Sequence, residues 1–236
     1  MILSHMKGLN GVQIVFQQHY GGLKMKIIEQ SHEILHIDGL ERIEIAGRTC
    51  YKSEDKITQD SADRFVKMLI KRGHEAMIEH GSATVKFITD RGVTHELVRH
   101  RTGIAFGQES TRYVNYGGDD IQFIHPVWCS TQLLNSVCID MAEMRWHQTM
   151  HESEEAYKSL LRHGWQPEHA RSVLPNSLKT EIVVTANFRE WRHIFKLRAV
   201  GTTGKPHPQM QALMIPVLKE FASIHPALFG DLLEKL

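Results

Sequence analysis

The sequence predicts a single α/β domain, and three observations support this fold class. Residues 82–88 alternate apolar and polar side chains, as a half-buried strand does, and residues 180–186 are rich in β-branched residues. Residues 130–163 carry the longest helical pattern, with apolar side chains three and four positions apart. No internal repeat, low-complexity tract or linker separates these segments, so we expect one domain.

The first half of the chain predicts strands and short helices. Residues 1–24 are punctuated by glycines without a sustained period, so we set them aside as an extension or vector-derived leader, expected to be poorly ordered. The domain then spans residues 25–236. We predict a strand over 24–35, a short helix over 40–51, and a second helix capped by Thr58 and ended by Gly73. A short helix over 93–100, an extended segment over 106–116 and a short strand over 121–125 follow the strand at 82–88.

The second half is more helical. Gly164 and Pro167 end the long helical pattern, and residues 168–173 form a helical turn. The strand at 180–186 leads into a helix over 188–197, and an amphipathic helix over 209–223 closes the domain before a short final helix after Pro226.

Composition excludes several classes of protein. The 236 residues are 42% hydrophobic and 23% charged, which is typical of a globular protein. A net charge of +1 argues against a general nucleic-acid binder, so any anion site must be a local cluster. The 3 cysteines form no CxxC pair, which favours a reducing, cytoplasmic location. No apolar run approaches the ~18 residues of a membrane span, and the N-terminus lacks the order of a signal peptide.

Clustered arginines carry the strongest chemical signal. The triplet Arg99-His100-Arg101 precedes a small polar stretch, residues 107–111, and then Arg112. Arginine presents a rigid fork of donors that matches phosphate and carboxylate, and it stacks on flat rings. The pattern predicts a site for a planar, anionic ligand, and the alternative is a solvated helix end whose cations complement the helix dipole. Three further arginines stand near element ends: Arg171, Arg189 and Arg198.

Other kinds of site have weaker support. His95 and His100 are five residues apart, whereas a zinc-binding helix needs a separation of four. His147 and His151 have that separation, but no third ligand is obvious nearby, so we predict no metal site. Ser110 has no nucleophile elbow, Cys129 and Cys138 have no activating motif, and the glycines form no dinucleotide or Walker loop. Ser110 is better interpreted as a hydroxyl donor to a phosphate or carbonyl.

Four motifs, in order, resemble those of the flavin-dependent thymidylate synthases, over the chain from about Met25 to the C-terminus. The main one is the Arg-His-Arg triplet followed by Ser110-Thr111-Arg112. The others are His-Glu…Glu-His at 74–80, Ala-Arg-Ser-Val-Leu-Pro at 170–175 and Asn-Phe-Arg…Leu-Arg at 187–198, with His-Pro-Gln following at 207–209. Four ordered matches are far more specific than any one of them.

The resemblance implies a fold, a reaction and a set of residues. It implies a central, mostly antiparallel sheet with packed helices, in a homotetramer whose sites are shared between subunits. The reaction is reductive methylation of dUMP to dTMP, with carbon from methylenetetrahydrofolate and hydride from FAD reduced by NADPH. Arg198 would be catalytic, activating the uracil by favouring its ionised N3, and no cysteine nucleophile is needed. The residues implied for dUMP are Glu96, Arg99, Gln108, Glu109, Ser110, Thr111, Arg112, Arg171 and Arg198. Those implied for FAD are Arg99, His100, Arg101, Gln108, Asn187, Arg189 and His193.

The chain departs from the family pattern at several positions. Ile104 stands where a serine is frequent, and Ala76-Met77 replaces a Thr/Ser-Pro pair, which removes one hydroxyl contact to the flavin. Near Glu96 the family usually has a glutamine. The stretch before Ser110 is one residue longer than the common form, so either Gln108 or Glu109 takes the acidic position of the motif. Two rival functions remain at this point: a nucleic-acid-binding module, and an inactive nucleotide-binding paralogue.

Overall fold

The computed structural model describes residues 15–20, 23–117, 121–129 and 141–236. By packing, the chain divides into two compact units, each collected from three stretches of sequence. Unit 1 takes its described residues from Met1–Glu33, Phe87–Thr94 and Gln108–Glu181. Unit 2 consists of Ile34–Lys86, His95–Gly107 and Ile182–Leu236.

A four-stranded sheet has the order β3-β4-β7-β5. Its strands are β3 (Ser31–Ile37), β4 (Ser82–Asp90), β7 (Lys179–Asn187) and β5 (Ile104–Gln108). Thr84 pairs with Thr185 through their hydroxyls, and further along the two strands Arg91 N–H donates to the carbonyl of Leu178. Because rising numbers on one strand meet falling numbers on the other, β4 and β7 are antiparallel.

By the same argument, β5 is antiparallel to β7. Asn187 N–H donates to the carbonyl of Gly103, and Glu109 N–H donates to the carbonyl of Glu181. Burial alternates along β4 and β7, as the sequence predicted for the strands at 82–88 and 180–186. The mostly antiparallel sheet with packed helices is thereby confirmed.

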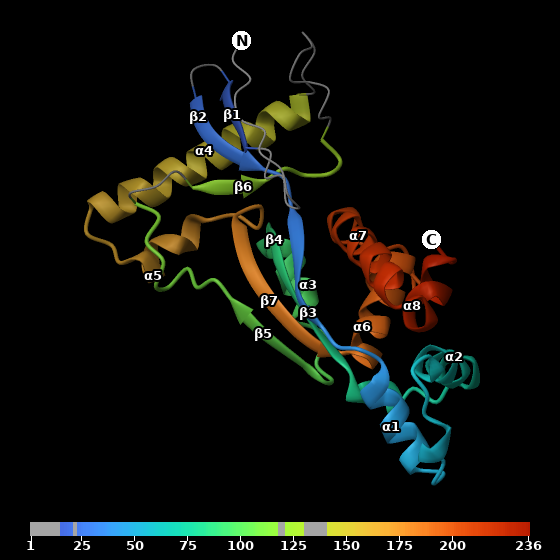
Figure 1. The fold of residues 1–236 in the computed structure, drawn as a ribbon. Helices are drawn as coiled ribbons and strands as arrows, with labels where there is room; N and C mark the ends of the chain where they lie inside the picture. Colours follow the sequence, from blue (N-terminus) through green and yellow to red (C-terminus); the bar gives the residue numbers. More distant parts are fainter. Residues whose placement is uncertain (1–14, 21–22, 118–120, 130–140) are drawn as a thin grey trace. The chain divides into compact units, whose positions relative to one another are not determined.

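Unit 1 contains a second, three-stranded sheet packed on a long helix. Strand β2 (Leu23–Ile28) pairs antiparallel with β1 (Val15–Tyr20) and parallel with β6 (Gln122–Ile124). Helix α4 (Met141–Arg162) runs beside this sheet (Figure 1) and is followed by α5 (Pro167–Ala170) and the 3-10 turn η4 (Arg171–Val173). The core between them contains Ile27 and Phe123 from the sheet and Met150 and Tyr157 from α4. Strand β1 lies within residues 1–24, the predicted extension or leader.

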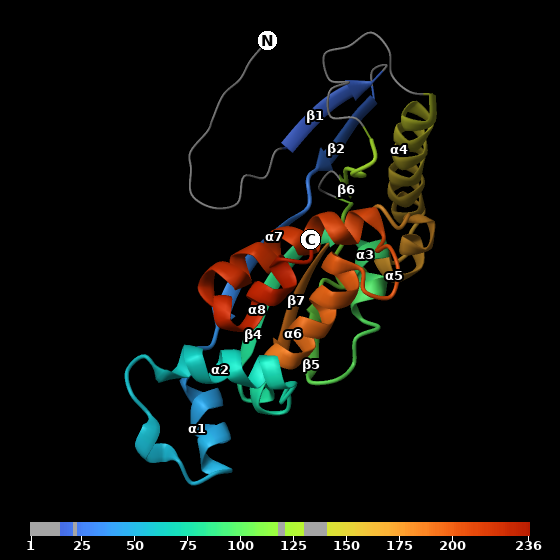
Figure 2. The same cartoon turned by 90° about the vertical axis from the view of Figure 1, so that its right-hand side faces the viewer.

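Unit 2 is built around an aromatic core. Its longer helices are α1 (Glu41–Thr49), α2 (Ser61–Arg72), α6 (Phe188–Phe195), α7 (Pro208–Ile224) and α8 (Pro226–Leu233), and α7 lies beside α8 (Figure 2). Trp191 is fully buried, stacks on Phe195 and donates its indole N–H to the carbonyl of Ala83 at 3.0 Å. Phe221 and Phe229 complete the cluster with tilted and edge-to-face contacts.

Short segments connect these elements. They are the 3-10 turns η1 (Glu54–Lys56) and η2 (Met77–His80), the helix α3 (Arg91–Leu97), and the π-helical turn η5 (Lys196–Val200) that continues α6. The predicted short helix at 93–100 is therefore α3, shifted toward the N-terminus. The strand predicted over 24–35 is two strands, β2 and β3, with residues 29 and 30 between them. The helical pattern predicted from residue 130 is described from Met141, and residues 130–140 lie outside the described part.

Two local predictions were wrong. Helix α2 begins at Ser61 and not after Thr58, because the Ser61 hydroxyl turns back to accept from Thr58 N–H at 2.9 Å and donates to Glu44 at 2.7 Å. The segment predicted as extended over 106–116 leaves the sheet after Gln108. It turns there because the carbonyl of Ser110 accepts from the N–H groups of Tyr113 and Val114.

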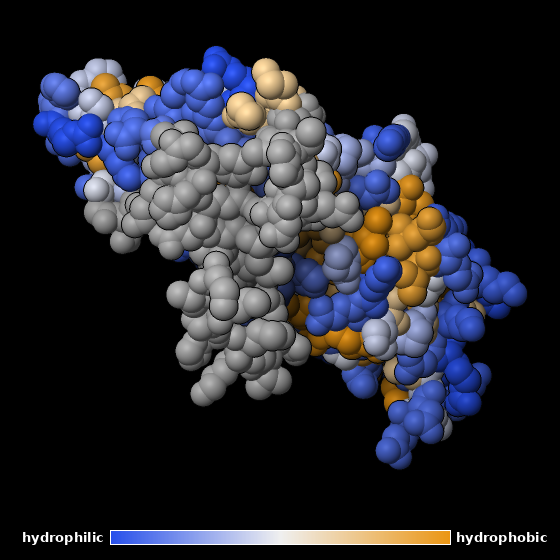
Figure 3. Space-filling view, turned by 90° about the horizontal axis from the view of Figure 1, so that it is seen from above, coloured by the Kyte–Doolittle hydropathy of each residue, from blue (hydrophilic) through white to orange (hydrophobic). Residues whose placement is uncertain are grey.

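The surface carries both polar and apolar residues. On the face in Figure 3, hydrophilic residues (blue) cover much of the described surface, and apolar residues (orange) gather toward the right of the view. The most exposed large hydrophobic residues are Tyr113, Met141 and Tyr51. Single exposed apolar residues such as these three are usual for folded proteins. Among the described helices, none has the length and apolarity to cross a membrane.

Candidate functional site

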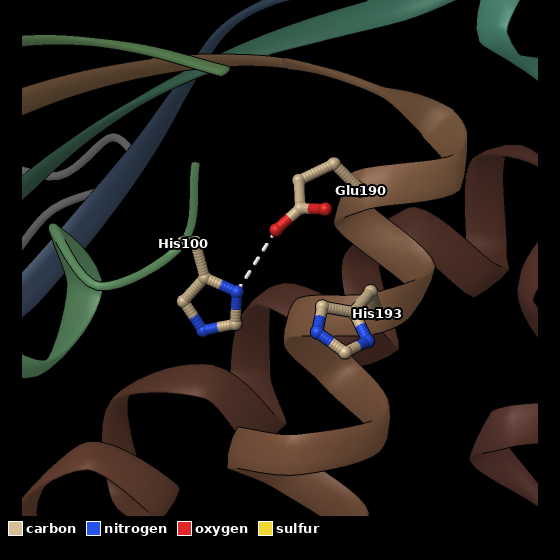
Figure 4. A group of neighbouring side chains, drawn as sticks. All are labelled: His100, Glu190 and His193. Atoms are coloured by element: carbon tan, nitrogen blue, oxygen red, sulfur yellow. Dashed lines mark hydrogen bonds and ion pairs between the residues drawn. The ribbon is translucent and has the colours of Figure 1, made fainter. Parts of the chain in front are cut away.

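Five residues of unit 2 form a connected polar cluster, which we call the His100 cluster: Glu96, His100, Glu190, His193 and Arg198. His100 is only 5% exposed, and its Nδ1 lies 2.9 Å from Glu190 Oε1. The His100 and His193 rings meet edge to face, with centroids 5.5 Å apart. Figure 4 shows Glu190 and His193 projecting from one helix toward His100, which comes from a different segment.

The start of α6 positions two members of the cluster. The Asn187 side chain caps the helix by accepting from the N–H of Glu190 at 2.9 Å. Glu190 and His193 are three residues apart, so they share one helix face. The Glu190 carboxylate also lies in the first turn, where the helix dipole favours a negative charge.

The π-helical turn η5 carries Arg198. Such turns contain an extra residue relative to an α-helix and occur frequently at functional sites. Gly201 ends the turn with φ of 80°, a left-handed conformation that suits glycine. Gln211 of α7 donates to the carbonyl of Ala199 at 2.9 Å, so this carbonyl of the π-helical turn has a hydrogen-bond partner.

Three contacts orient the Arg198 guanidinium. Nη1 donates to Glu96 Oε2 at 2.7 Å, and Nη2 reaches the Glu96 carbonyl at 3.4 Å. Nε faces His100 Nε2 at 3.4 Å. The side chain keeps 22% exposure, so it is held in place while part of it stays open to a ligand.

These contacts fix the proton on His100. Burial, the Arg198 guanidinium and His193 lower the pKa of His100 to about 4, so the ring is neutral near pH 7. Because Nε2 accepts from Arg198, the single proton sits on Nδ1 and is donated to Glu190. Burial raises the pKa of Glu190 to about 6, which leaves this carboxylate largely ionised at neutral pH. Glu190 thereby sets the tautomer that Arg198 requires.

Unit 2 has a cavity lined by two members of the His100 cluster, and a larger cavity adjoins it. One, of about 340 Å³, is lined in part by Asn187, Arg189, Glu190, His193 and Lys196. The other, of about 610 Å³, is lined by polar and apolar side chains that include Tyr51, Phe65, Met68, Met77 and Arg189. Arg189 and Glu75 line both cavities, so the two are adjacent.

Ion pairs hold the cationic residues of the smaller cavity. Arg189 donates to Glu79 at 2.6 Å and lies 3.7 Å from Glu75, while Lys196 donates to Glu75 at 3.1 Å. The hydrogen bond to Glu79 raises the pKa of Arg189, so it stays charged. The carboxylates of Glu75 and Glu79 therefore neutralise the two cationic side chains. An anionic ligand would have to compete with these carboxylates for them.

Unit 1 brings together a second set of predicted residues. Arg171 Nη1 donates to Thr111 Oγ1 at 3.1 Å, although 60 residues separate them in the chain. Arg112 pairs with Glu168 at 3.3 Å, and Ser110 Oγ accepts from the N–H of Arg112. We call Ser110, Thr111, Arg112 and Arg171 the Arg171 cluster. It offers hydroxyl and guanidinium donors, which suit a phosphate.

The structure distinguishes the two residues that compete for the acidic position. Gln108 donates its amide to the hydroxyls of Thr94 (3.0 Å) and Thr180 (3.3 Å). Glu109 accepts from the Tyr116 hydroxyl at 2.6 Å and from Lys179 at 3.2 Å. Burial, together with the bond to Glu109, raises the pKa of Tyr116. Gln108 is thus held by two threonine hydroxyls, whereas the Glu109 carboxylate forms an ion pair with Lys179.

Some predicted site residues do not join either cluster. Arg99 and Arg101 are exposed, while His100 between them is buried. The triplet therefore splits into one structural anchor and two cations that face solvent. Sequence reasoning missed Glu190, whose separation of three from His193 was a usable signal, and it missed Tyr116, Lys179 and Lys196.

The chain matches known proteins over most of its length. The model of a family described as thymidylate synthase complementing protein (Thy1) matches residues 34–227. A flavin-dependent thymidylate synthase of Corynebacterium efficiens is 33% identical over 198 residues, 80% of this chain and 78% of the relative. One from Mycobacteroides abscessus is 33% identical over 203 residues, again 80% of this chain and 78% of the relative.

Two solved structures share the fold. A UMP/dUMP methylase, PolB from Streptomyces cacaoi, bound with 5-Br dUMP, has a TM-score of 0.71 at 22% identity and covers 86% of this chain and 95% of its own. Thymidylate synthase X from Helicobacter pylori, with FAD and dUMP, has a TM-score of 0.68 at 22% identity and covers 86% and 99%. At this identity the likeness supports the fold.

Proposed function

This chain belongs to the flavin-dependent thymidylate synthases, an enzyme family whose cofactor is FAD, and from that premise we propose that it converts dUMP to dTMP by reductive methylation. The observation that carries the proposal is Arg198, held by Glu96 and by a neutral His100 and still partly exposed. We place the enzyme in the cytoplasm, as a homotetramer whose sites are shared between subunits.

Unit 2 has groups that fit FAD. The larger cavity has aromatic and thioether side chains suited to a flat ring system, and the smaller one has cations suited to phosphate oxygens. Asn187, Arg189 and His193 line the smaller cavity, and we propose that the exposed Arg99 and Arg101 also contact FAD. His100 does not need to contact the ligand, because its role is to orient the Arg198 guanidinium. When bound, FAD supplies the hydride that reduces the carbon delivered by methylenetetrahydrofolate, and NADPH serves as the reductant.

The Arg171 cluster of unit 1 fits the phosphate of dUMP. Arg171 and Arg112 supply charged donors, and Ser110 and Thr111 supply hydroxyls. Gln108 is engaged by two threonines in the sheet, so it acts by holding this segment, and Glu109 takes the acidic position. If the enzyme is a homotetramer, the Arg171 cluster and the His100 cluster of one site can come from different subunits.

Arg198 acts on the base in this proposal. A fixed cation beside the uracil edge stabilises the negative charge that develops when N3 ionises, and this makes the ring a better nucleophile. The cation costs little reorganisation because Glu96 and His100 already hold it. No cysteine is required as a nucleophile in this proposal.

Visible absorption and product analysis test the proposal together. The purified protein, with FAD added, should show an oxidised-flavin band that NADPH bleaches when dUMP is present, and methylenetetrahydrofolate should then give dTMP. Arg198→Ala should retain the flavin band and lower the rate of dTMP formation by about 10²–10³-fold. Arg64→Ala, at an exposed position of α2, is the matched control and should keep the rate.

Two results would contradict the proposal at different points. Normal dTMP formation by Arg198→Ala would remove the role given to this residue. Flavin binding without any dTMP from the parent protein would favour the inactive nucleotide-binding paralogue.

A further inference from the structure

A group of potential metal ligands that the proposed reaction does not use lies in unit 1. Among the described residues, His125, Cys129 and Glu143 each offer a ligand atom, and these atoms lie within 4.8 Å of one another. We propose that this group, which we call the His125 cluster, binds a zinc ion that ties the segment after β6 to helix α4. The proposal is independent of the thymidylate synthase reaction.

The backbone fixes the first two ligands. His125 directly follows β6, and its N–H donates to the carbonyl of Ile28 in β2 at 2.9 Å. Cys129 closes a turn in which its N–H donates to the carbonyl of Pro126 at 2.9 Å. The two ligands are therefore four residues apart on a short, hydrogen-bonded turn, a spacing that zinc sites use.

Helix α4 supplies the other side of the cluster. Glu143 is in its first turn and only 6% exposed, and His147 follows one turn later at 4% exposure. His147 Nε2 lies 3.8 Å from Glu143 Oε1, which is beyond hydrogen-bond distance but within the range of two ligands on one ion. His147 thus lies next to Glu143, but its ring nitrogens are not among the ligand atoms that converge.

The donor set favours zinc over harder or softer ions. It combines one thiolate, imidazole nitrogen and one carboxylate, whereas Mg²⁺ and Ca²⁺ prefer oxygen alone. Ligand atoms around tetrahedral Zn²⁺ are separated by about 3–4 Å, so the cluster needs to contract by on the order of 1 Å. Glu29 Oε1 lies 3.4 Å from His125 Nδ1, the place where a carboxylate commonly supports a metal-bound histidine. His125 would then coordinate through Nε2.

Burial explains why an ion is useful here. A carboxylate at 6% exposure loses most of its hydration, and a nearby dication compensates that loss. The cluster also joins segments on both sides of residues 130–140, so one ion would link the sheet of unit 1 to α4.

Equilibrium metal binding to the intact flavoprotein tests the proposal. Zn²⁺ is titrated against a chromogenic chelator, and Co²⁺ is added separately to look for a thiolate-to-cobalt charge-transfer band in the difference spectrum. We expect one Zn²⁺ per chain and a cobalt–thiolate band. Cys129→Ser and Glu143→Gln should each weaken Zn²⁺ binding by at least about tenfold, and Cys129→Ser should abolish the band.

Two control variants make the result specific. Cys50→Ser removes an exposed thiol of unit 2 and should leave Zn²⁺ affinity and the cobalt band unchanged. His193→Ala alters the other described group with converging ligands, His100, Glu190 and His193, and should also leave Zn²⁺ affinity unchanged. Circular dichroism checks that each variant is folded. If Cys129→Ser does not fold, the Zn²⁺ affinity of Glu143→Gln tests the proposal.

Several outcomes would overturn the proposal. They are the absence of stoichiometric Zn²⁺ binding, binding that survives both Cys129→Ser and Glu143→Gln, and binding lost in His193→Ala but kept in Cys129→Ser. The last result would assign the ion to the His100 cluster instead.

Discussion

Replacing His100 with asparagine should reduce the stability that the protein loses on acidification from pH 6.5 to 4. The buried His100 donates to Glu190 and accepts from Arg198. Asparagine can keep the donor to Glu190, because its amide nitrogen lies near the position of Nδ1, but it does not titrate. The variant therefore removes the proton equilibrium of His100.

The size of the effect follows from two opposed pKa shifts. The pKa of His100 is lowered from 6.5 to about 4, so the unfolded chain binds the proton more readily in this window. This contribution to stability is present above pH 6.5 and is lost as the pH falls through 4, by about 3 kcal/mol in total. The pKa of Glu190 is raised from 4.5 to about 6, so its contribution is present below pH 4.5 and is lost as the pH rises through 6, by about 2 kcal/mol.

The contribution of the His100–Glu190 pair to the pH dependence should consequently differ in sign between the wild type and the variant. Through these two groups, the wild type should lose a net of about 1 kcal/mol on acidification from pH 6.5 to 4, because the His100 contribution exceeds that of Glu190. In His100→Asn only the contribution of Glu190 remains, and this contribution amounts to a gain of about 2 kcal/mol over the same pH range. The difference between the two pH profiles is about 3 kcal/mol and does not depend on the other titrating groups that both proteins share.

Urea unfolding followed by far-ultraviolet circular dichroism, repeated at several pH values, gives both profiles. His163→Asn, at an exposed position near the end of α4, is the control and should give a profile parallel to the wild type. Parallel profiles for wild type and His100→Asn would refute the assignment of a neutral, buried imidazole, and with it the tautomer argument for Arg198.

Three further changes should have separable effects. Trp191→Ala removes a fully buried indole and its bond to Ala83, and should cost about 3–5 kcal/mol, measured as a lower Tm. Arg171→Ala removes the donor that holds Thr111 and should raise KM for dUMP at least about tenfold while the FAD content stays constant; an unchanged KM would place the phosphate elsewhere. Gly103→Ala introduces a Cβ at φ of 63° that would clash with the side-chain nitrogen of Asn187, and should cost about 1–2 kcal/mol of unfolding free energy; an unaltered urea midpoint would contradict this.

Local patterns in the sequence determined most of the elements. The alternation at residues 82–88 and the β-branched run at 180–186 predicted β4 and β7, because a strand exposes its two faces at every second residue. The same reasoning failed at Thr58 and after Gln108, where single side-chain and backbone hydrogen bonds set the boundary. Boundaries depend on such contacts, which periodicity does not encode.

For the site, the ordered motifs identified the family and drew attention to the arginines, since their clustering is visible in the chain itself. The separate roles within the triplet were not visible: the structure buries His100 and exposes Arg99 and Arg101. The different contacts of Gln108 and Glu109 were not visible either, because Glu109 pairs with Lys179, about 70 residues away in the chain.

Tertiary packing alone decided which distant side chains meet. His100 and Glu190 are 90 residues apart, and Glu96 and Arg198 are 102 apart, yet each pair is in direct contact. The His125 cluster likewise joins a turn after β6 to α4. Secondary structure follows from local sequence, whereas burial of the core selects the long-range pairs, and those pairs set the pKa of His100, the orientation of Arg198 and the proposed zinc site.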